Sequence, residues 1–367
     1  MTLVAASAAD VREAVLSTDG PLLPVAGATK PALSTAQDTA ATPLDVSALR
    51  GITSYDPAEL TFTARAGTPV REAAAALAEH GQYLPFDPPL ADAGATLGGA
   101  VAAGVSGSGA FRHGGVRDFI IGVRLVDGTG SLIAGGGQVV KNAAGFDLPK
   151  LMVGSAGRLG VLTELSFKVF PHPRATTTLS FEPLGRDAAL ATVARLARGP
   201  VALDALDVEP TPDGSRRILA RIGGDPAALD ARAVRLASYV EAPHERLAPD
   251  EETALWRDTG ELRWAAPGAL VARIPVTAPA IPMLDAFLAA HRAAARWTLG
   301  ANAVWVAWPA ELPPRELGDA LAGLGLTAVA LTGTGGPLLG ARRGGAFAAR
   351  VRGALDPDGR FAGADLA

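Results

Sequence analysis

Apolar and polar positions alternate along the first part of the chain in ways that predict short strands and short helices. Residues 10–16 predict a helix capped by Asp10, because their apolar members recur on one side. Residues 59–67, "ELTFTARAG", are apolar at every second position, which predicts a strand with one buried face. Thr68 and Pro69 then predict the cap and the first position of another helix.

Further along, the pattern predicts first a hairpin and then a separate layer. Residues 119–136 hold two strand-like runs around Asp127 and Gly128, and residues 160–173 read as another strand closed by prolines. After Pro173, strands and helices alternate twice over, with one helix expected over 278–295. This alternation predicts an α+β layer built from two comparable halves.

Composition narrows the classes of function. The 367 residues carry a net charge of −4, and 49% of them are hydrophobic, which is typical of a globular protein without a nucleic-acid-binding face. Cysteine is absent, so this chain holds no disulfide, thiolate nucleophile or cysteine-ligated iron–sulfur cluster. No signal peptide or apolar run long enough to span a bilayer is evident, so we expect a cytoplasmic protein without direct membrane insertion, which reaches the inner membrane, if at all, through its partners.

A run from Gly94 to Gly115, "GATLGGAVAAGVSGSGAFRHGG", consists mostly of glycine and alanine. Inside a compact domain a stretch this long is more often functional than a linker, so we expect a loop that something approaches closely. Residues 24–30, "PVAGATK", and 154–164, "GSAGRLGVLTE", share this character. Three such loops could hold a pyrophosphate through backbone N–H groups. The partial matches "GSGAFR" and "GGGQVV" lack the context of a dinucleotide-binding fingerprint.

Three signatures, taken together and in order, resemble a known family. They are "LLPVAGATKPAL", "PFDPPLADAGATLGGAVAAGVSGSGAFRHGGVRDFIIGVRLVDGTG" and "VVKNAAGFDLPKLMVGSAGRLGVLTELSFKVFP". The chain resembles the FAD-binding domain of the vanillyl-alcohol-oxidase / PCMH-type flavoproteins, and within them the GlcE-type FAD-binding subunits of bacterial glycolate oxidase. The resemblance covers residues 1–173 well and the rest loosely, resuming at "LDPDGRFAG".

The resemblance implies an α+β fold with a PCMH-type FAD-binding domain of two α+β subdomains and an α+β, ferredoxin-like cap domain. The implied boundaries are 1–173 for the FAD-binding domain, 174–340 for the cap, and 341–367 for a C-terminal segment that returns to the first domain. The implied cofactor is FAD. Neither His nor Cys occupies the loop from Gly27 to Thr29, and the chain has no cysteine, so we expect FAD to be bound non-covalently.

The resemblance also implies which residues bind the cofactor. Residues 25–30 correspond to a first pyrophosphate loop, 92–99 to a second, 103–106 to the segment after it, and 156–162 to the adenine and ribose side. Ala156 stands where the family motif has an acidic residue, which removes one polar contact. The candidate cofactor-binding residues are Val25, Ala26, Gly27, Ala28, Thr29, Lys30, Ala95, Thr96, Gly98, Gly99, Ala103, Gly104, Val105, Ser106, Arg112, Lys141, Ala156, Gly157, Gly160 and Val161.

Several of these side chains also have a plain structural interpretation. Arg112 could meet a phosphate or the reduced flavin, or could form a surface salt bridge. For His113, a role as a hydrogen-bonding spacer is favoured over a role as a catalytic base. Lys141 is equally consistent with a place near the flavin and with an exposed side chain. The five tryptophans either line a binding surface or fill the core of the cap. No catalytic residue is assigned, and the scattered histidines give no metal-ligand spacing.

Three functions remain open from the sequence. The first is a FAD-binding subunit of a glycolate oxidase-like complex, in which a second flavoprotein subunit oxidises the 2-hydroxy acid and an iron–sulfur subunit takes the electrons. The second is a self-contained FAD-dependent 2-hydroxy-acid oxidase or dehydrogenase, with a cap arginine such as Arg257, Arg263 or Arg273 holding the carboxylate. The third is a non-catalytic scaffold subunit.

Overall fold

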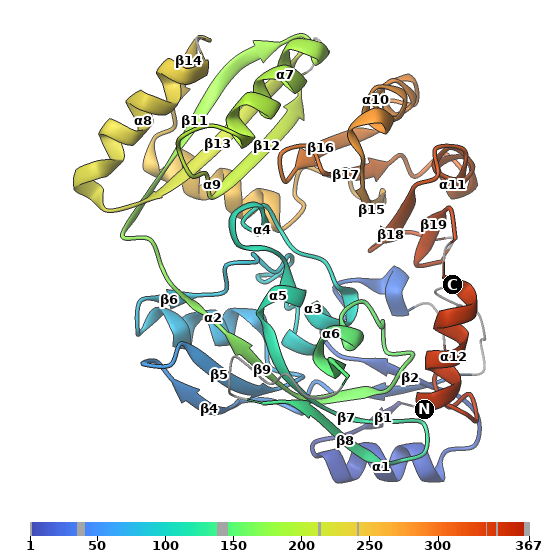
Figure 1. Ribbon diagram of the computed structural model, residues 1–367. Coiled ribbons are helices and arrows are strands. Elements are labelled where there is room, and N and C mark those ends of the chain that lie inside the picture. The colour runs from blue at the N-terminus through green and yellow to red at the C-terminus, as the bar shows by residue number, and fades with distance from the viewer. Residues whose placement is uncertain are drawn as a thin grey trace.

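The chain folds into two bodies, one above the other in Figure 1. The structure, a computed structural model, describes residues 2–34, 41–137, 146–211, 214–240, 242–334, 336–342 and 344–362. The lower body contains the first 173 residues and the C-terminal helix, and the upper body is built on one large sheet.

The lower body holds two main sheets. A small parallel sheet has the order β1-β3-β2, and an antiparallel sheet has the order β4-β5-β9-β7-β8. The predicted hairpin and the predicted strands are present in the second sheet. The strands of this body are β1 (Leu3–Val4), β2 (Leu22–Val25), β3 (Thr42–Asp45), β4 (Ile52–Asp56), β5 (Thr61–Arg65), β6 (Gln82–Tyr83), β7 (Ile120–Val126), β8 (Leu132–Gly136), β9 (Val161–Lys168) and β10 (Phe170–Pro171).

The helices of the lower body are short. They are α1 (Ala8–Ser17), the 3-10 turn η1 (Pro31–Ser34), α2 (Val70–Ala78), α3 (Leu97–Ala103), α4 (Ala110–His113), α5 (Val116–Phe119), α6 (Leu148–Met152) and α12 (Gly345–Leu355). The predicted caps were one to three residues out of place. Ser7 caps α1 and Asp10 closes its capping box from the third position. Pro69 is the cap of α2, because the hydroxyl of Thr68 donates instead to the carbonyl of Arg65.

The loop predicted over residues 94–115 was wrong in part, because much of it is helical in α3 and α4. Glycine disfavours helix, yet α3 buries Leu97, Ala100 and Val101, and burial outweighs propensity. The small side chains let α3 approach β5: a Cβ on Gly98 would lie 2.9 Å from the Cβ of Ala66. Close helix packing therefore accounts for part of the glycine content.

The upper body is a nine-stranded antiparallel sheet in the order β14-β11-β13-β12-β16-β17-β15-β18-β19. Each half follows the order strand, helix, two strands, helix, strand, and the halves meet where β12 pairs with β16. This confirms the predicted α+β layer of two comparable halves. Its elements are β11 (Ala175–Leu184), α7 (Arg186–Ala197), β12 (Ala205–Pro210), β13 (Arg216–Gly224), α8 (Pro226–Val240), β14 (His244–Arg246), α9 (Pro249–Gly260), β15 (Leu270–Pro275), η2 (Ala278–Ala280), α10 (Ile281–Ala290), β16 (Ala294–Thr298), β17 (Ala303–Trp308), α11 (Pro314–Gly323), β18 (Thr327–Ala330) and β19 (Leu338–Gly340).

The helix predicted over residues 278–295 was too long. The structure divides it into η2, α10 and the first residues of β16, because Arg292 adopts a φ of +52° and turns the chain. The predicted cap boundaries at 173 and 340 lie just before β11 and at the end of β19.

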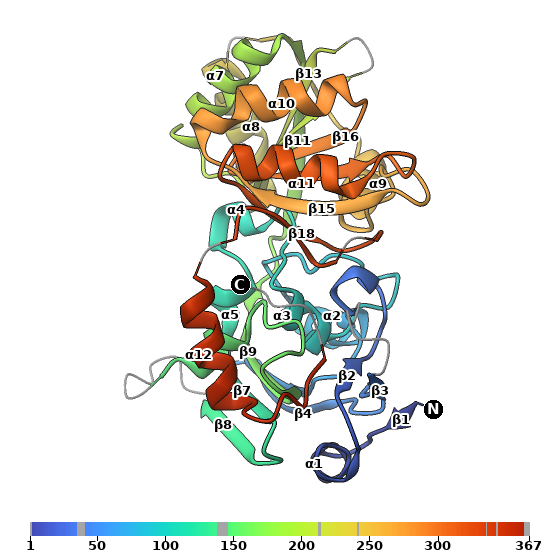
Figure 2. The same ribbon diagram turned by 90° about the vertical axis from the view of Figure 1, so that its right-hand side faces the viewer.

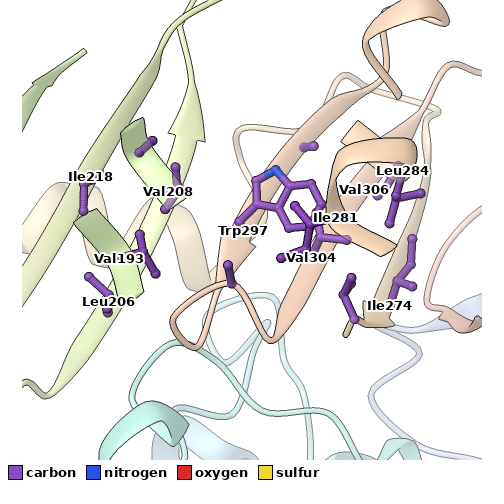
Figure 3. Close-up of a cluster of buried hydrophobic side chains, with 14 of the residues drawn as sticks. Val193, Leu206, Val208, Ile218, Ile274, Ile281, Leu284, Trp297, Val304 and Val306 are labelled. Atoms are coloured by element: carbon purple, nitrogen blue, oxygen red, sulfur yellow. The ribbon is translucent and has the colours of Figure 1, made fainter. Parts of the chain in front are cut away.

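The two faces of the cap sheet have different neighbours. Helices α7, α8, α10 and α11 cover one face, and Figure 3 shows the apolar side chains between them, among them Val208, Trp297 and Val306. The other face meets the lower body: Val271 and Trp305 belong to the same buried cluster as first-domain residues such as Phe167. The cap is therefore docked on the first domain by apolar contact.

The end of the chain returns to the lower body. Helix α12 runs beside it (Figures 1 and 2), and Phe361, which is fully buried, packs with Leu22 and Leu44. The N–H of Leu22 donates to the carbonyl of Arg360, and the N–H of Ala362 donates to the carbonyl of Leu22. None of the helices in the described ranges is both long and apolar enough to cross a bilayer.

Candidate functional site

A cavity opens in the lower body between the loop after β2, helix α3 and the loop that leads into β9. It holds about 750 Å³ of empty space, counted together with its open mouth. Its wall is made of Pro24, Val25, Ala26, Gly27, Ala28, Thr29, Lys30, Leu33, Ser34, Val46, Ala66, Thr96, Gly98, Gly99, Ala102, Ala103, Ala156, Gly157, Gly160, Val161 and Leu162. Small residues dominate the wall, so a ligand here meets backbone more than side chains.

The loop over residues 26–30 offers unused donors. Its backbone N–H groups donate to no acceptor within the part of the chain that the structure describes. Ala28 holds a φ of +51°, a strained conformation for a residue with a Cβ. A Cβ on Gly27 would collide with the carbonyl oxygen of Gly94, so glycine lets this loop pack on the next one. Successive free N–H groups in such a loop form a concave site for an anion.

Helix α3 contributes its surface rather than its N–H groups. The N–H of Leu97 donates to Thr68, that of Gly98 to Ala66, and that of Gly99 to the Thr96 hydroxyl at 3.1 Å. These donors are therefore already used. A Cβ on Gly99 would meet only this same hydroxyl oxygen, also at 3.1 Å, so Gly99 keeps this side of the cavity open.

The loop before β9 shows the same kind of strain. Ala156 has a φ of +48°, followed by Gly157 at +77° and Gly160 at +144°. The N–H of Ala156 donates to the carbonyl of Ala102, which ties this loop to the end of α3. Strained backbone on two sides of one cavity is typical of a binding site.

Lys30 is the one cation among the described residues of the cavity wall. Only 7% of this residue is exposed, and its ammonium donates to the hydroxyl of Thr29 at 3.2 Å. Burial lowers the pKa of Lys30 to about 8, while the charge of Glu261 opposes the shift. No carboxylate of the described residues lies within ion-pair distance of it. The cavity therefore favours an anionic ligand at this end.

The structure brings most of the predicted cofactor-binding residues together. Those that line the cavity are Val25, Ala26, Gly27, Ala28, Thr29, Lys30, Thr96, Gly98, Gly99, Ala103, Ala156, Gly157, Gly160 and Val161. Those placed outside the wall are Ala95, Gly104, Val105, Ser106 and Arg112, and Lys141 lies outside the described residues.

Arg112 and its neighbours connect the lower body to the cap instead. The Arg112 guanidinium pairs with Asp204 of the cap, and the hydroxyl of Ser108 donates to Asp207 of β12 at 2.6 Å. His113 packs edge-on against Phe170, with ring centroids 4.8 Å apart, and burial lowers its pKa. Figure 2 shows α4 at the junction of the two bodies. For Arg112, the salt-bridge interpretation fits this structure.

Sequence reasoning missed five residues of the wall. Val46 and Ala66 directly follow strands β3 and β5, and the others are Leu33, Ser34 and Ala102. Pro24 and Leu162 lay in the predicted segments without being singled out. They are ordinary small or apolar residues, so their types carry no chemical signal. Only for Ala66 did the sequence carry a signal, because the alternation of apolar residues in the strand before it predicts that Ala66 is buried.

Comparison with known proteins agrees with this geometry. Residues 1–136 match the family model described as FAD binding domain. Glycolate oxidase subunit GlcE of Escherichia coli (strain K12) is 52% identical over 139 residues, which are 38% of this chain and 40% of GlcE. Glycolate oxidase subunit GlcD of Bacillus subtilis (strain 168) is 34% identical over 163 residues, 44% of this chain and 34% of that protein. The matched part is thus two fifths or less of these relatives' length.

Solved structures extend the likeness to the whole chain. p-Cresol methylhydroxylase with bound substrate superposes with a TM-score of 0.73 at 14% identity, over 98% of this chain and 88% of that chain. An alkyldihydroxyacetonephosphate synthase superposes with a TM-score of 0.73 at 14% identity, over 98% of this chain and 75% of that chain. At such identity the likeness concerns the fold. Residues 1–136 therefore match a FAD-binding domain, in a region like that of the glycolate oxidase subunit GlcE, and the chain as a whole has the fold of p-cresol methylhydroxylase.

Proposed function

We propose that this chain is the FAD-binding subunit of a glycolate oxidase-like complex that oxidises glycolate to glyoxylate. A second flavoprotein subunit and an iron–sulfur subunit complete the complex, and electrons pass through flavin to the latter. The observation that carries the proposal is the cavity whose loop at residues 26–30 presents unused backbone donors beside the buried cation Lys30. The names of GlcE and GlcD, both subunits of glycolate oxidase, support it.

The wall of the cavity fits the parts of FAD. The N–H groups of residues 26–30 and the ammonium of Lys30 would bind the pyrophosphate, which is an anion. The bare surfaces of Gly99 and Gly157 would leave room for the extended molecule. Among the described residues, the wall contains no cysteine, histidine or tyrosine that could form a covalent link, which supports dissociable FAD.

Bound FAD would supply the two-electron redox chemistry, and the chain's own residues would hold and shield it. The cap sheet packs on the lower body through Val271 and Trp305, which keeps water from this apolar contact. Because the chain has no cysteine, an iron–sulfur cluster that takes the electrons would belong to a partner.

The decisive experiment is the visible absorbance spectrum of the purified chain, followed by acid release of any chromophore. We expect a yellow protein that releases free FAD. Glycolate turnover would then be measured for the chain alone and with its two partner subunits, and we expect turnover only in the complex. Turnover by the chain alone would instead support a self-contained 2-hydroxy-acid oxidase. A colourless chain that does not bind added FAD, either alone or with its partners, would overturn the proposal. It would support a non-catalytic scaffold subunit instead.

A further inference from the structure

The cap holds one loop of the first domain through a carboxylate. Helix α9 lies on the side of the cap that faces the first domain (Figure 1), and Glu261 directly follows it. The two oxygens of Glu261 accept the N–H of Asp92 at 2.8 Å and the N–H of Ala93 at 3.1 Å. Hydrogen bonds to a charged acceptor are stronger than those between neutral groups. This pair of contacts therefore fixes the loop over residues 90–95 on the cap.

The same loop has a conformation that needs support. Leu90 holds a φ of +65°, which is strained for a residue with a Cβ, and Gly94 holds a φ of +101°. The carbonyl of Gly260 accepts the N–H of Leu90 at 3.0 Å, so the cap also holds the strained residue. Strained backbone persists only where its surroundings fix it. The contacts with the cap supply part of that support.

Glu261 is poorly placed for the stability of its own helix. It is the C-terminal cap of α9, where the partial negative charge of the helix end disfavours a carboxylate. No cation of the described residues lies within ion-pair distance of it, since the nearby Arg257 pairs with Asp92 and Arg263 pairs with Asp258. The N–H groups of the loop are therefore the partners that its charge serves.

The loop in turn supports the functional site. The loop over residues 26–30 supplies the unused donors of the site's cavity, which we call the cofactor cavity. Gly27 of this loop lies so close to Gly94 that a Cβ on Gly27 would collide with the carbonyl oxygen of Gly94 and lie 3.5 Å from the Cα of Ala95. The two loops thus touch backbone to backbone. A shift of residues 90–95 would therefore move the anion-binding loop.

We infer that Glu261 is a positioning residue for the cofactor cavity, because it holds the loop over residues 90–95 in the form against which the loop over residues 26–30 packs. The affinity for FAD thus depends on a cap residue that does not line the cofactor cavity. The inference rests on the proposed function for the identity of the ligand. The charge of Glu261 also reaches the site, because it opposes the effect of burial on the pKa of Lys30.

The test compares Glu261→Asp with the wild type. Aspartate keeps the charge but is one methylene shorter, so it cannot reach both N–H groups unless the loop moves. The affinity for FAD is measured by titration of the flavin-free protein, followed by the quenching of flavin fluorescence. We expect the dissociation constant of Glu261→Asp to rise about three- to tenfold, the range for one lost hydrogen bond. Equal affinity in the two proteins would overturn the inference.

Arg257→Gln is the matched control. Arg257 belongs to α9 and pairs with Asp92 at 2.6 Å, so it contacts the same loop from the same helix. The two side chains are 60% and 40% exposed, and an exposed ion pair contributes little. We expect Arg257→Gln to change the affinity for FAD less than twofold. A loss as large as that in Glu261→Asp would overturn the special role given to Glu261.

Hydrogen exchange distinguishes positioning from a general loss of stability. In the flavin-free protein, the N–H groups of Asp92 and Ala93 should exchange faster in Glu261→Asp than in the wild type and should be unchanged in Arg257→Gln. The urea concentration at the midpoint of unfolding should differ little among the three proteins, because the contacts lie in an exposed loop. Unchanged exchange of both N–H groups in Glu261→Asp would contradict the inference.

The pH dependence of FAD binding gives a second such readout. A protonated Lys30 favours the anionic pyrophosphate, so the affinity should decline as the pH rises through the pKa of Lys30, about 8. Glu261→Gln removes the charge that keeps this pKa from falling further, so the decline should begin at a lower pH. Glu261→Asp keeps the charge and should decline where the wild type does. A decline at the wild-type pH in Glu261→Gln would overturn the electrostatic part of the inference.

The outcome is separable from that of the proposed function. Flavin-binding wild type with equal affinity in Glu261→Asp removes only this inference. If the wild type binds no FAD, the proposed function fails, and the same variants are titrated with ADP, which carries a pyrophosphate. Weaker binding of ADP to Glu261→Asp than to the wild type would then uphold the role of Glu261, and binding of neither ligand would overturn both.

Discussion

Arg216 and Arg273 are arginines in strands of the same sheet with opposite surroundings. Arg216 donates to both oxygens of Asp285, at 2.7 and 2.8 Å, whereas Arg273 has a buried Nε and no partner within the described residues. Burial lowers the pKa of Arg273, with no carboxylate to oppose it. A buried charge without a counter-ion destabilises a fold, and removing one partner of a buried pair does the same.

We therefore expect substitution by methionine to change the stability of the protein in opposite directions at these two arginines. Arg216→Met should lower the free energy of unfolding by about 3–5 kcal/mol, because it leaves the buried Asp285 with only Arg186, 3.9 Å away. Arg273→Met should raise the free energy of unfolding by about 1 kcal/mol or more. Urea unfolding of the flavin-free protein, followed by tryptophan fluorescence, measures both. A loss of stability in Arg273→Met would show that this guanidinium has a partner after all.

Lys30 makes stability depend on pH. Its pKa is about 8 in the folded chain and near 10.5 when unfolded, so between these values the unfolded chain binds more protons. The penalty of burying its charge is complete below pH 8 and is lifted as the pH rises toward 10.5. Lys30→Met should therefore be more stable than the wild type at pH 7, by up to about 3 kcal/mol, and this advantage should vanish near pH 10.5. Urea unfolding of both flavin-free proteins across this range checks the sign, and a constant difference would contradict it.

At the scale of an element, two adjacent glycines of helix α3, Gly98 and Gly99, serve different purposes. Both glycines line the cofactor cavity, but a Cβ on Gly98 would overlap Ala66, whereas a Cβ on Gly99 would meet only the Thr96 hydroxyl and would otherwise occupy open space. Gly98→Ala should lose roughly 1–3 kcal/mol of stability through overpacking. Gly99→Ala should fold at least as well, because alanine favours helix, and should bind FAD more weakly.

The comparison needs two measurements on each variant, urea unfolding and FAD affinity by fluorescence titration. The pair serves as its own control, since the substitution and the helix are the same. Loss of FAD affinity in Gly98→Ala at full stability, or unchanged FAD affinity in Gly99→Ala, would contradict this division of tasks.

Elements with a strict apolar period were predictable from the sequence, and those set by distant contacts were not. Residues 59–67 alternate and form β5, because each second side chain meets the core. Helix α3 contradicts local propensity and exists because Leu97 and Val101 are buried by other strands. The loops of the cofactor cavity were recognisable by motif. The pairing of Arg112 with Asp204, 92 positions away, was not, because no local pattern encodes it.

On the scale of the whole molecule, the C-terminal segment holds the first domain together. Phe361 is fully buried against Leu22 and Leu44, although it lies more than 300 positions from them. Phe361→Ala should cost about 3–5 kcal/mol, the usual range for a buried aromatic residue. All five tryptophans lie between residues 256 and 308, so their emission reports on the cap and, through Trp305, on its contact with the first domain.

Two probes therefore separate the bodies in this variant. When Phe361→Ala is unfolded in urea, part of the loss of far-ultraviolet circular dichroism should occur at a lower urea concentration than in the wild type. The unfolding transition followed by tryptophan emission should shift much less. Phe347→Ala is the control, because Phe347 of α12 is 63% exposed and should shift neither curve. Equal displacement of both curves in Phe361→Ala would mean that the cap and the first domain unfold as one unit.

The two ends of the cap sheet bear on how the protein behaves in a crowded solution. A nine-stranded sheet offers two free edges, and a free edge can recruit strands from other molecules into aggregates. Here each edge strand has three residues, and β14 presents only His244, Glu245 and Arg246, all exposed. An incoming strand would gain few hydrogen bonds and would meet charge at that edge. Both edges of the cap sheet thus disfavour the addition of strands from other molecules. A protein with this large open sheet should therefore stay unaggregated at high concentration.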